Sequence, residues 1–206
     1  MDTLRSHDYE YEHDDFYCYP GSPVLKNKLN ITDGELLETA ERDITYLRAL
    51  EAAQKHIPGH FDYAHLKRIH RFLFGDVYDW AGQTRLVNIS KGNPFCQVPF
   101  IDAQMDRIST QLKKENYLKD LKDRTMIAKR LAYYLGEINA VHPFREGNGR
   151  AQRMFIEHLA HTLGYRLDFS KISREDMILA SSKAFVMDYA MLENLIENIL
   201  EEERNM

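Results

Sequence analysis

Apolar residues recur at three- and four-residue steps along most of the chain, the spacing expected for the buried face of a helix. The pattern is clearest between Asp123 and Val141, where a continuous apolar stripe predicts a buried helix. Further helices are expected at residues 33–55, after Asp62, at 102–116, from Asn148 to Gly164, after Ser173 and from Asp188 through Leu200. The pattern therefore predicts a mainly helical, all-α fold.

Residues that commonly cap helix N-termini precede several of these segments. They are Asp33, Asp62, Asp123 and Ser173, the last followed by Asp176 in a capping box. The helix after Asp33 is expected to bury an apolar face made of Leu36, Leu37, Ala40, Ile44, Leu47 and Leu50. The only tryptophan, Trp80, is expected to anchor the core.

One stretch, at about residues 84–100, instead has the alternating, β-branched pattern of strands. Its two short runs flank a Gly92-Asn93-Pro94 turn, which predicts a β-hairpin. A two-stranded hairpin is marginal alone, so it must pack on the helices, and it can keep an open edge to which a guest strand could add. No other segment has a convincing strand pattern, and the acidic tail after Leu200 is expected to be a solvated end.

Composition narrows the class of protein. A formal net charge of -5 argues against a protein whose main task is to bind nucleic acid, which usually needs a basic face. The 2 cysteines are too few for a disulfide framework and lack metal-site spacing. No apolar run approaches the ~20 residues that span a bilayer. We therefore expect a cytoplasmic protein with one domain at residues 31–203, an irregular aromatic arm at residues 1–30, and no nucleic-acid or membrane partner.

The residues best suited to catalysis and ligand binding lie between His142 and Arg153, in a loop and the helix that follows it. Histidine titrates near neutrality, so His142 is a candidate general base. Glu146 is a hard oxygen ligand of the kind that binds Mg²⁺. The Gly147-Asn148-Gly149 segment places free backbone N–H groups at a helix start, where an anion can bind.

Two arginines and an aromatic residue complete this stretch. Arg150 and Arg153 lie three residues apart, so on a helix they share a face and could hold the same anion. Phe144 has no chemical role and is expected to bury the loop and fix its shape. Each part alone has an ordinary structural explanation; Glu157, for example, could form a simple helical ion pair with Arg153. Their conjunction favours a site that holds a polyphosphate and moves a proton.

The run His142-Pro143-Phe144-Arg145-Glu146-Gly147-Asn148-Gly149-Arg150, followed by Arg153, resembles the signature of the Fic (Fido) family of protein AMP-transferases at every position. Further resemblance lies at residues 19–21, 25–27, 73–82 and 89–96. The resemblance implies a mainly helical Fic fold with one β-hairpin, the family's flap.

The resemblance also implies a reaction, in which AMP passes from ATP, with Mg²⁺, to a Tyr, Thr or Ser hydroxyl of a target protein. His142 would accept the hydroxyl proton and Glu146 would bind Mg²⁺. Residues Gly147, Asn148 and Gly149 would form the anion hole. Arg150 and Arg153 would hold the β- and γ-phosphates. The flap, through Ile89, Ser90 and Lys91, would clamp the target as an added strand.

An absence suggests how such an enzyme is controlled. Fic enzymes are commonly restrained by a helix with a Ser/Thr-x-x-x-Glu-Gly/Asn motif, whose glutamate pairs with the second arginine. Ser6 and Glu10 have the spacing, but Tyr11 follows them, and the pairs at residues 193–194 and 197–198 lack the Ser or Thr. We therefore expect the inhibitory helix on a separate small antitoxin, the class I arrangement. This resembles bacterial toxins and effectors that are delivered into a host or recipient cell.

Two alternatives stay open. The same scaffold could transfer another nucleotide, phosphocholine or a phosphate, although the intact Gly147, Gly149 and Arg153 favour AMP. The chain could also be a non-catalytic module that binds a target through the flap, although the intact His142 and Glu146 argue against it.

Overall fold

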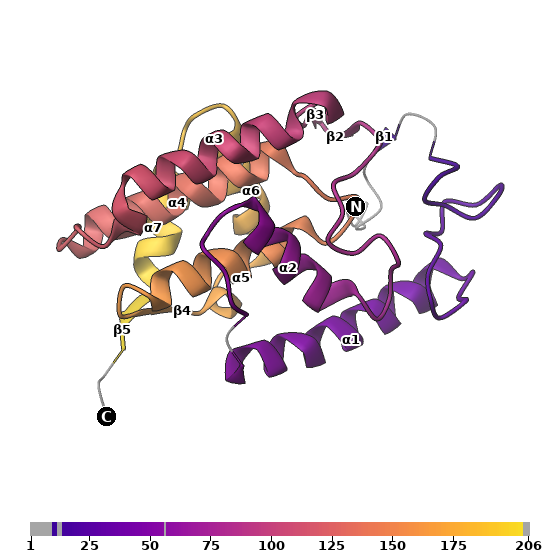
Figure 1. Ribbon diagram of the computed structural model, residues 1–206, viewed down its shortest axis with the longest axis horizontal. Coiled ribbons are helices and arrows are strands. Elements are labelled where there is room, and N and C mark those ends of the chain that lie inside the picture. The colour runs from indigo at the N-terminus through magenta and orange to yellow at the C-terminus, as the bar shows by residue number, and fades with distance from the viewer. Residues whose placement is uncertain (1–9, 12–13, 56, 204–206) are drawn as a thin grey trace.

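The computed structural model describes residues 10–11, 14–55 and 57–203 (Figure 1). Its α-helices are α1 (Gly34–Gln54), α2 (Tyr63–Phe74), α3 (Ile101–Lys114), α4 (Arg124–Val141), α5 (Asn148–His161), α6 (Arg174–Phe185) and α7 (Ala190–Ile199). Short 3₁₀ turns occur at Val98–Phe100, Asn116–Leu118 and Phe169–Lys171. The predicted mainly helical fold is confirmed.

The predicted caps explain where several helices begin. The side chains of Asp33, Asp62, Asp123 and Ser173 each accept a hydrogen bond from a backbone N–H in the first turn of α1, α2, α4 and α6, respectively. Each bond satisfies a donor that the helix itself cannot pair. The sequence therefore determines these helix starts locally.

Helix α4 is the centre of the core, where it packs against α3, α5, α6 and α7. Helix α2 packs on α5, and α1 packs on α2 at the outside of the fold (Figure 1). Trp80 is buried, as predicted, and its ring meets the buried ring of Tyr17 edge-on at a centroid distance of 5.5 Å. This packing holds the end of α4 and the start of α5 together, which is where the candidate site lies.

Helix α1 buries only part of the predicted apolar face: Leu37 is buried, and Ala40 and Ile44 are half-buried. Glu41 and Thr45 point inward because both bind Arg150 of α5. Turning these polar residues inward leaves part of the apolar face in solvent. The residues that were expected to be buried and are exposed are Leu36, Leu47 and Leu50.

The predicted hairpin is present as β2 (Ile89–Lys91) and β3 (Asn93–Pro94), which pair antiparallel. It is not alone, because β1 (Glu10–Tyr11) pairs antiparallel with the other side of β2, with Glu10 opposite Ser90. The strand order is therefore β1-β2-β3. The edge of β2 that was expected to be open is covered by the backbone of the chain's own arm.

A second small sheet corrects the prediction for the acidic tail. Strand β5 (Leu200–Glu202) pairs antiparallel with β4 (Tyr165–Leu167), which also lacked a recognisable strand pattern. Leu200 lies opposite Leu167 and both side chains are buried. Burial of this pair fixes a segment that its three glutamates alone would place in solvent.

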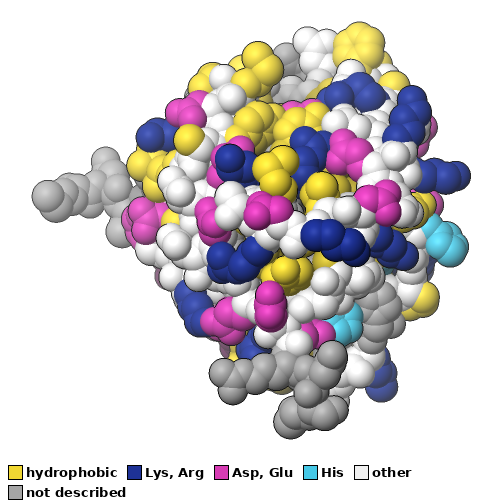
Figure 2. All heavy atoms as spheres, turned by 90° about the vertical axis from the view of Figure 1, so that its left-hand side faces the viewer, with side chains coloured by type: hydrophobic (Ala, Val, Ile, Leu, Met, Phe, Trp, Pro, Cys, Tyr) yellow, Lys and Arg dark blue, Asp and Glu magenta, His cyan; other side chains and the backbone are white. Residues whose placement is uncertain are grey.

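Residues 14–30 form an irregular segment with one isolated bridge between Cys18 and Leu25. The rest of the predicted arm, residues 1–9 and 12–13, including Ser6, lies outside the described residues. Figure 2 shows acidic and basic side chains intermixed over one end of the molecule, rather than gathered into a basic patch. Among the described residues, no helix combines the length with the apolarity that crossing a bilayer requires.

Candidate active site

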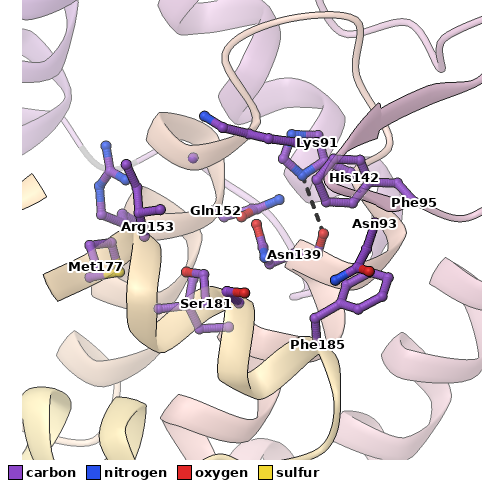
Figure 3. A pocket seen from close by; sticks show the side chains of 14 residues that line it. Lys91, Asn93, Phe95, Asn139, His142, Gln152, Arg153, Met177, Ser181 and Phe185 are labelled. Atoms are coloured by element: carbon purple, nitrogen blue, oxygen red, sulfur yellow. Dashed lines mark hydrogen bonds between the residues drawn. The ribbon is translucent and has the colours of Figure 1, made fainter. Parts of the chain in front are cut away.

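A cavity of about 260 Å³ lies between the flap, the end of α4, the start of α5 and the side of α6 (Figure 3). His142 and Asn139 approach it from α4, and Arg153 approaches it from α5. Its other lining residues include Lys91, Asn93 and Phe95 of the flap, Gly149 and Gln152 of α5, and Met177, Ile178, Ser181 and Phe185 of α6. The cavity thus joins the predicted base to the predicted second arginine.

His142 ends α4 in the left-handed conformation, with φ of 51°. Its ring stacks on Phe95 of the flap at a centroid distance of 3.9 Å. Its Nδ1 lies 3.2 Å from the Asn139 carbonyl oxygen. Because a carbonyl only accepts, Nδ1 must carry the proton, and the basic lone pair is then on Nε2.

Burial lowers the pKa of His142 to about 3. The Asn139 hydrogen bond opposes this shift, whereas the positive charges of Arg85 and Lys91 reinforce it. The imidazole is therefore neutral at physiological pH, the form that a general base requires.

The loop after His142 closes on itself through Asn148. The Asn148 side chain accepts from the Phe144 N–H at 2.8 Å and donates to the Phe144 carbonyl at 2.7 Å. Phe144 is fully buried beneath the loop. The side chain of Asn148 therefore shapes the loop, and only the backbone of this residue is left to contact a ligand at the start of α5.

His70 of α2 holds the same loop from below. Its Nδ1 accepts from the Gly82 N–H at 2.9 Å, so its Nε2 must donate to the Glu146 carbonyl, also at 2.9 Å. The ring packs against Phe144 at a centroid distance of 3.9 Å, with the two ring planes tilted by 30°, and is completely buried. Burial lowers the pKa of His70 to about 3, so this contact is made by a neutral ring.

Gly147 makes the turn into α5 with φ of +77°. A Cβ at this position would lie 2.2 Å from the ring of Phe74, so the loop needs glycine here for both conformation and space. The Gly147 N–H donates to the Glu146 carboxylate at 2.8 Å. Burial, and then the nearby charge of Glu41, raises the pKa of Glu146.

Glu146 fits a Mg²⁺ site in which the protein supplies a single carboxylate ligand. Within the described residues, no three potential His, Cys, Asp or Glu ligands cluster. Mg²⁺ is commonly held by one or two carboxylates together with substrate phosphates and waters, so the single half-buried carboxylate of Glu146 is compatible with it. Glu146 does not line the cavity described above, although its loop borders it.

Arg150 points toward α1 rather than into the cavity. It pairs with Glu41, donates to Thr45 Oγ1 at 3.0 Å, and lies 4.0 Å from Glu146 Oε1. Tyr78 donates a short hydrogen bond to the same Glu41 carboxylate. Glu41 thus fixes the position of the first arginine from a distant helix.

Arg153 lines the cavity, with its guanidinium over Gly149. Burial lowers its pKa, which the negative charge of Glu157 opposes. Within the described part of the chain, no hydrogen bond or ion pair holds this guanidinium, and Glu157 makes no close ion pair with it. Burial raises the pKa of Glu157 to about 7, so this carboxyl group is only partly ionised near neutrality.

The predicted flap residues differ in their burial. Ile89 is buried, whereas Ser90 and Lys91 are half-buried. Of these, Lys91 lines the cavity, where Figure 3 shows its side chain extending across the cavity near His142.

Several residues that build this site have no local signal in the sequence. They are Asp14, Glu41, His70 and Arg85, which lie far from the loop along the chain. Asp14 pairs with Arg145 in the loop, and both side chains are less than a tenth exposed. The only signal in the sequence is that Glu41 and Thr45 interrupt the apolar face of the first helix, which could have suggested that these two polar residues are buried.

Comparison with known proteins agrees with the geometry. A model of the Fic/DOC family matches residues 60–160. The chain is 42% identical over 189 residues to the protein adenylyltransferase VbhT of Bartonella schoenbuchensis, covering 91% of this chain and 39% of VbhT. It is 38% identical to the probable protein adenylyltransferase Fic of Escherichia coli, covering 91% and 93% of the two chains.

Solved structures agree as well. The BepC protein of Bartonella tribocorum, with bound AMPPNP, matches with a TM-score of 0.85 at 31% identity, covering 91% of this chain and 97% of that chain. An N-terminal Fic domain from Bartonella quintana, with bound ADP, matches with a TM-score of 0.88 at 32% identity, covering 93% and 97%. The predicted resemblance is therefore confirmed, and the chain belongs to the Fic/DOC family.

Proposed function

We propose that this protein is a protein adenylyltransferase, which transfers AMP from ATP to a Tyr, Thr or Ser hydroxyl of a target protein. The observation that carries the proposal is that one cavity is lined by a buried neutral imidazole, His142, and by a half-buried guanidinium, Arg153, near the start of α5. Relatives named protein adenylyltransferases, and matching structures that contain AMPPNP or ADP, support it.

In the proposed reaction, the target hydroxyl oxygen forms a bond to the α-phosphorus of ATP. The bond from that phosphorus to the oxygen bridging to the β-phosphate breaks, and pyrophosphate leaves. The hydroxyl proton passes to Nε2 of His142. Because the Asn139 carbonyl and the Phe95 ring fix the imidazole, catalysis rests largely on positioning.

Backbone N–H groups at the start of α5 and the guanidinium of Arg153 would stabilise the phosphates. Arg150 is held toward α1 by Glu41, so its positive charge would stabilise the phosphates from outside the cavity. Glu146 would hold Mg²⁺, which when bound neutralises phosphate charge. The apolar wall of α6, with Met177 and Phe185, would face the nucleoside.

Radiolabelled ATP tests the proposal. The purified chain with Mg²⁺ and α-labelled ATP should label proteins in a bacterial lysate. His142→Ala should abolish the labelling, whereas His161→Ala, at an exposed histidine outside the cavity, should preserve it. Label from γ-labelled ATP in place of α-labelled ATP would indicate a kinase and overturn the proposal. Labelling that persists in His142→Ala would overturn the role of His142.

We further propose that the activity is restrained by a small antitoxin whose helix carries the Ser/Thr-x-x-x-Glu-Gly/Asn motif. Two observations support this: the sequence lacks the motif, and no carboxylate of the described residues pairs with Arg153. The matching Bartonella proteins are described as translocated effectors, which supports a toxin or effector role. The chain purified alone should therefore be active. Inactivity of the isolated chain that is relieved by truncating its own termini would contradict a separate inhibitor.

A further inference from the structure

The most unusual charged side chain outside the cavity is Arg85, which follows α2 and lies at the base of the flap stretch, before β2. It is completely buried, with a relative exposure of 0%. No carboxylate of the described residues lies within ion-pair distance of it. A buried charge of this kind is expensive unless other polar groups compensate it. Carbonyl oxygens do so here.

On one side, Arg85 binds the end of α4. Its Nε donates to the His142 carbonyl at 2.8 Å and one Nη donates to the Val141 carbonyl at 3.4 Å. Its backbone N–H donates to the Pro143 carbonyl at 2.9 Å. These acceptors lie at the negative end of the helix dipole, where a cation is stabilised and where carbonyls lack partners within the helix.

On the other side, Arg85 binds both legs of the flap hairpin. One Nη donates to the Val87 carbonyl at 2.7 Å, and the other makes a short hydrogen bond to the Cys96 carbonyl. The Cys96 N–H in turn donates to the Ala140 carbonyl of α4 at 3.2 Å. One guanidinium therefore joins the two legs of the flap to each other and to the catalytic histidine.

We propose that Arg85 is a positioning residue, which locks the flap and His142 into one rigid unit so that a hydroxyl held by the flap meets the imidazole. The inference rests on the proposed transferase function. Arg85 does not line the cavity, and its guanidinium binds carbonyls of the flap and of the end of α4, so it acts on the alignment of target and base rather than on nucleotide binding. Lysine cannot replace it, because one ammonium cannot span acceptors on two elements in a fixed fork.

The test compares Arg85→Lys and Arg85→Gln with the parent, and uses Arg130→Lys as the matched control. Arg130 is a partly buried arginine that makes a forked contact to Glu115, and it lies on α4 ten residues before Ala140, where the flap contacts that helix. Calorimetry should give an AMPPNP affinity within about 3-fold of the parent for every variant. The rate of label transfer to lysate proteins should fall by roughly 100-fold in both Arg85 variants, the scale expected for misaligned reactants. Arg130→Lys should transfer label at the parent rate.

Hydrogen exchange gives a readout that does not depend on activity. In the Arg85 variants, amides of residues 86–97 and 141–144 should exchange faster together, while those of α2 and α5 keep their protection. A parent that transfers no label would overturn the proposed function, and the exchange comparison would still decide the coupling. The positioning role would be overturned if label transfer were unchanged, or if hydrogen exchange were unchanged or uniformly faster. It would also be overturned if AMPPNP binding were lost in step with transfer, or if both Arg85 variants failed to fold.

Discussion

Acid should destabilise this protein through His70, the buried ring beneath the catalytic loop. Both ring nitrogens are used, one accepting from Gly82 and the other donating to the Glu146 carbonyl. Protonation would convert the accepting nitrogen into a donor that faces another donor. The folded state therefore resists protonation, with a pKa of about 3 against 6.5 for an ordinary histidine.

The size of the effect follows from this difference. As the pH falls below 6.5 the unfolded chain binds a proton at His70 that the folded chain does not, so stability falls by about 1.4 kcal/mol per pH unit. At pH 5 the loss should be about 2 kcal/mol. His142 titrates in the same sense. Glu157, whose folded pKa is raised, titrates in the opposite sense and stabilises the fold as the pH falls from about 7.

The contribution of His70 is isolated by comparing the parent with His70→Gln, in which a neutral amide can still donate to the Glu146 carbonyl. Urea unfolding at pH 7.5 should show His70→Gln to be less stable, because the packing of the ring between Phe144 and Phe74 is lost. At pH 5 this difference should shrink by about 2 kcal/mol. His60→Gln, at an exposed position, is the matched control. A difference between parent and His70→Gln that stays constant with pH would refute the argument.

Three further predictions concern the same loop. Asp14→Asn should leave the buried cation of Arg145 uncompensated and lower stability by about 3 kcal/mol, seen as a fall in Tm of roughly 6–12 °C; an unchanged Tm would contradict the importance of this pair. Gly147→Ala should cost roughly 2–4 kcal/mol in urea unfolding, because it forces a left-handed alanine against Phe74, and a neutral effect would contradict that packing. The rate of AMP transfer should show no acid limb near pH 6.5, because the pKa of His142 is about 3; a limb at 6.5 in the pH–rate profile would show that the imidazole is solvated.

The features that could be predicted from the sequence are those encoded by neighbouring residues. Helix starts depend on caps such as Asp62 and Asp123, which act within one turn, and the hairpin depends on its own turn. The order of groups in the catalytic loop is likewise contiguous. These features are visible without knowing what lies beside them in space.

The features that could not be predicted depend on partners that are distant in the chain. Nothing around Glu41 indicates that it faces Arg150, so the apolar-face argument wrongly placed Leu36, Leu47 and Leu50 in the core. The pairing of β5 with β4 depends on burial of Leu200 against Leu167, not on the strand propensity of either segment. Arg85 and Asp14 are charged residues in unremarkable surroundings, and only the folded chain shows that they are buried against the loop.

The three-stranded sheet at the flap limits the binding energy that a target strand would gain from backbone hydrogen bonds. Because β1 already pairs with β2, a guest strand that takes the same edge exchanges one set of backbone hydrogen bonds for another. On the opposite side β3 ends in Pro94, which has no N–H to donate. The backbone then contributes little net affinity, and preference among targets must come from side chains. Under the proposed function, a target strand would have to displace the pairing of the chain's own residues Glu10 and Tyr11, which would select against weakly matching proteins.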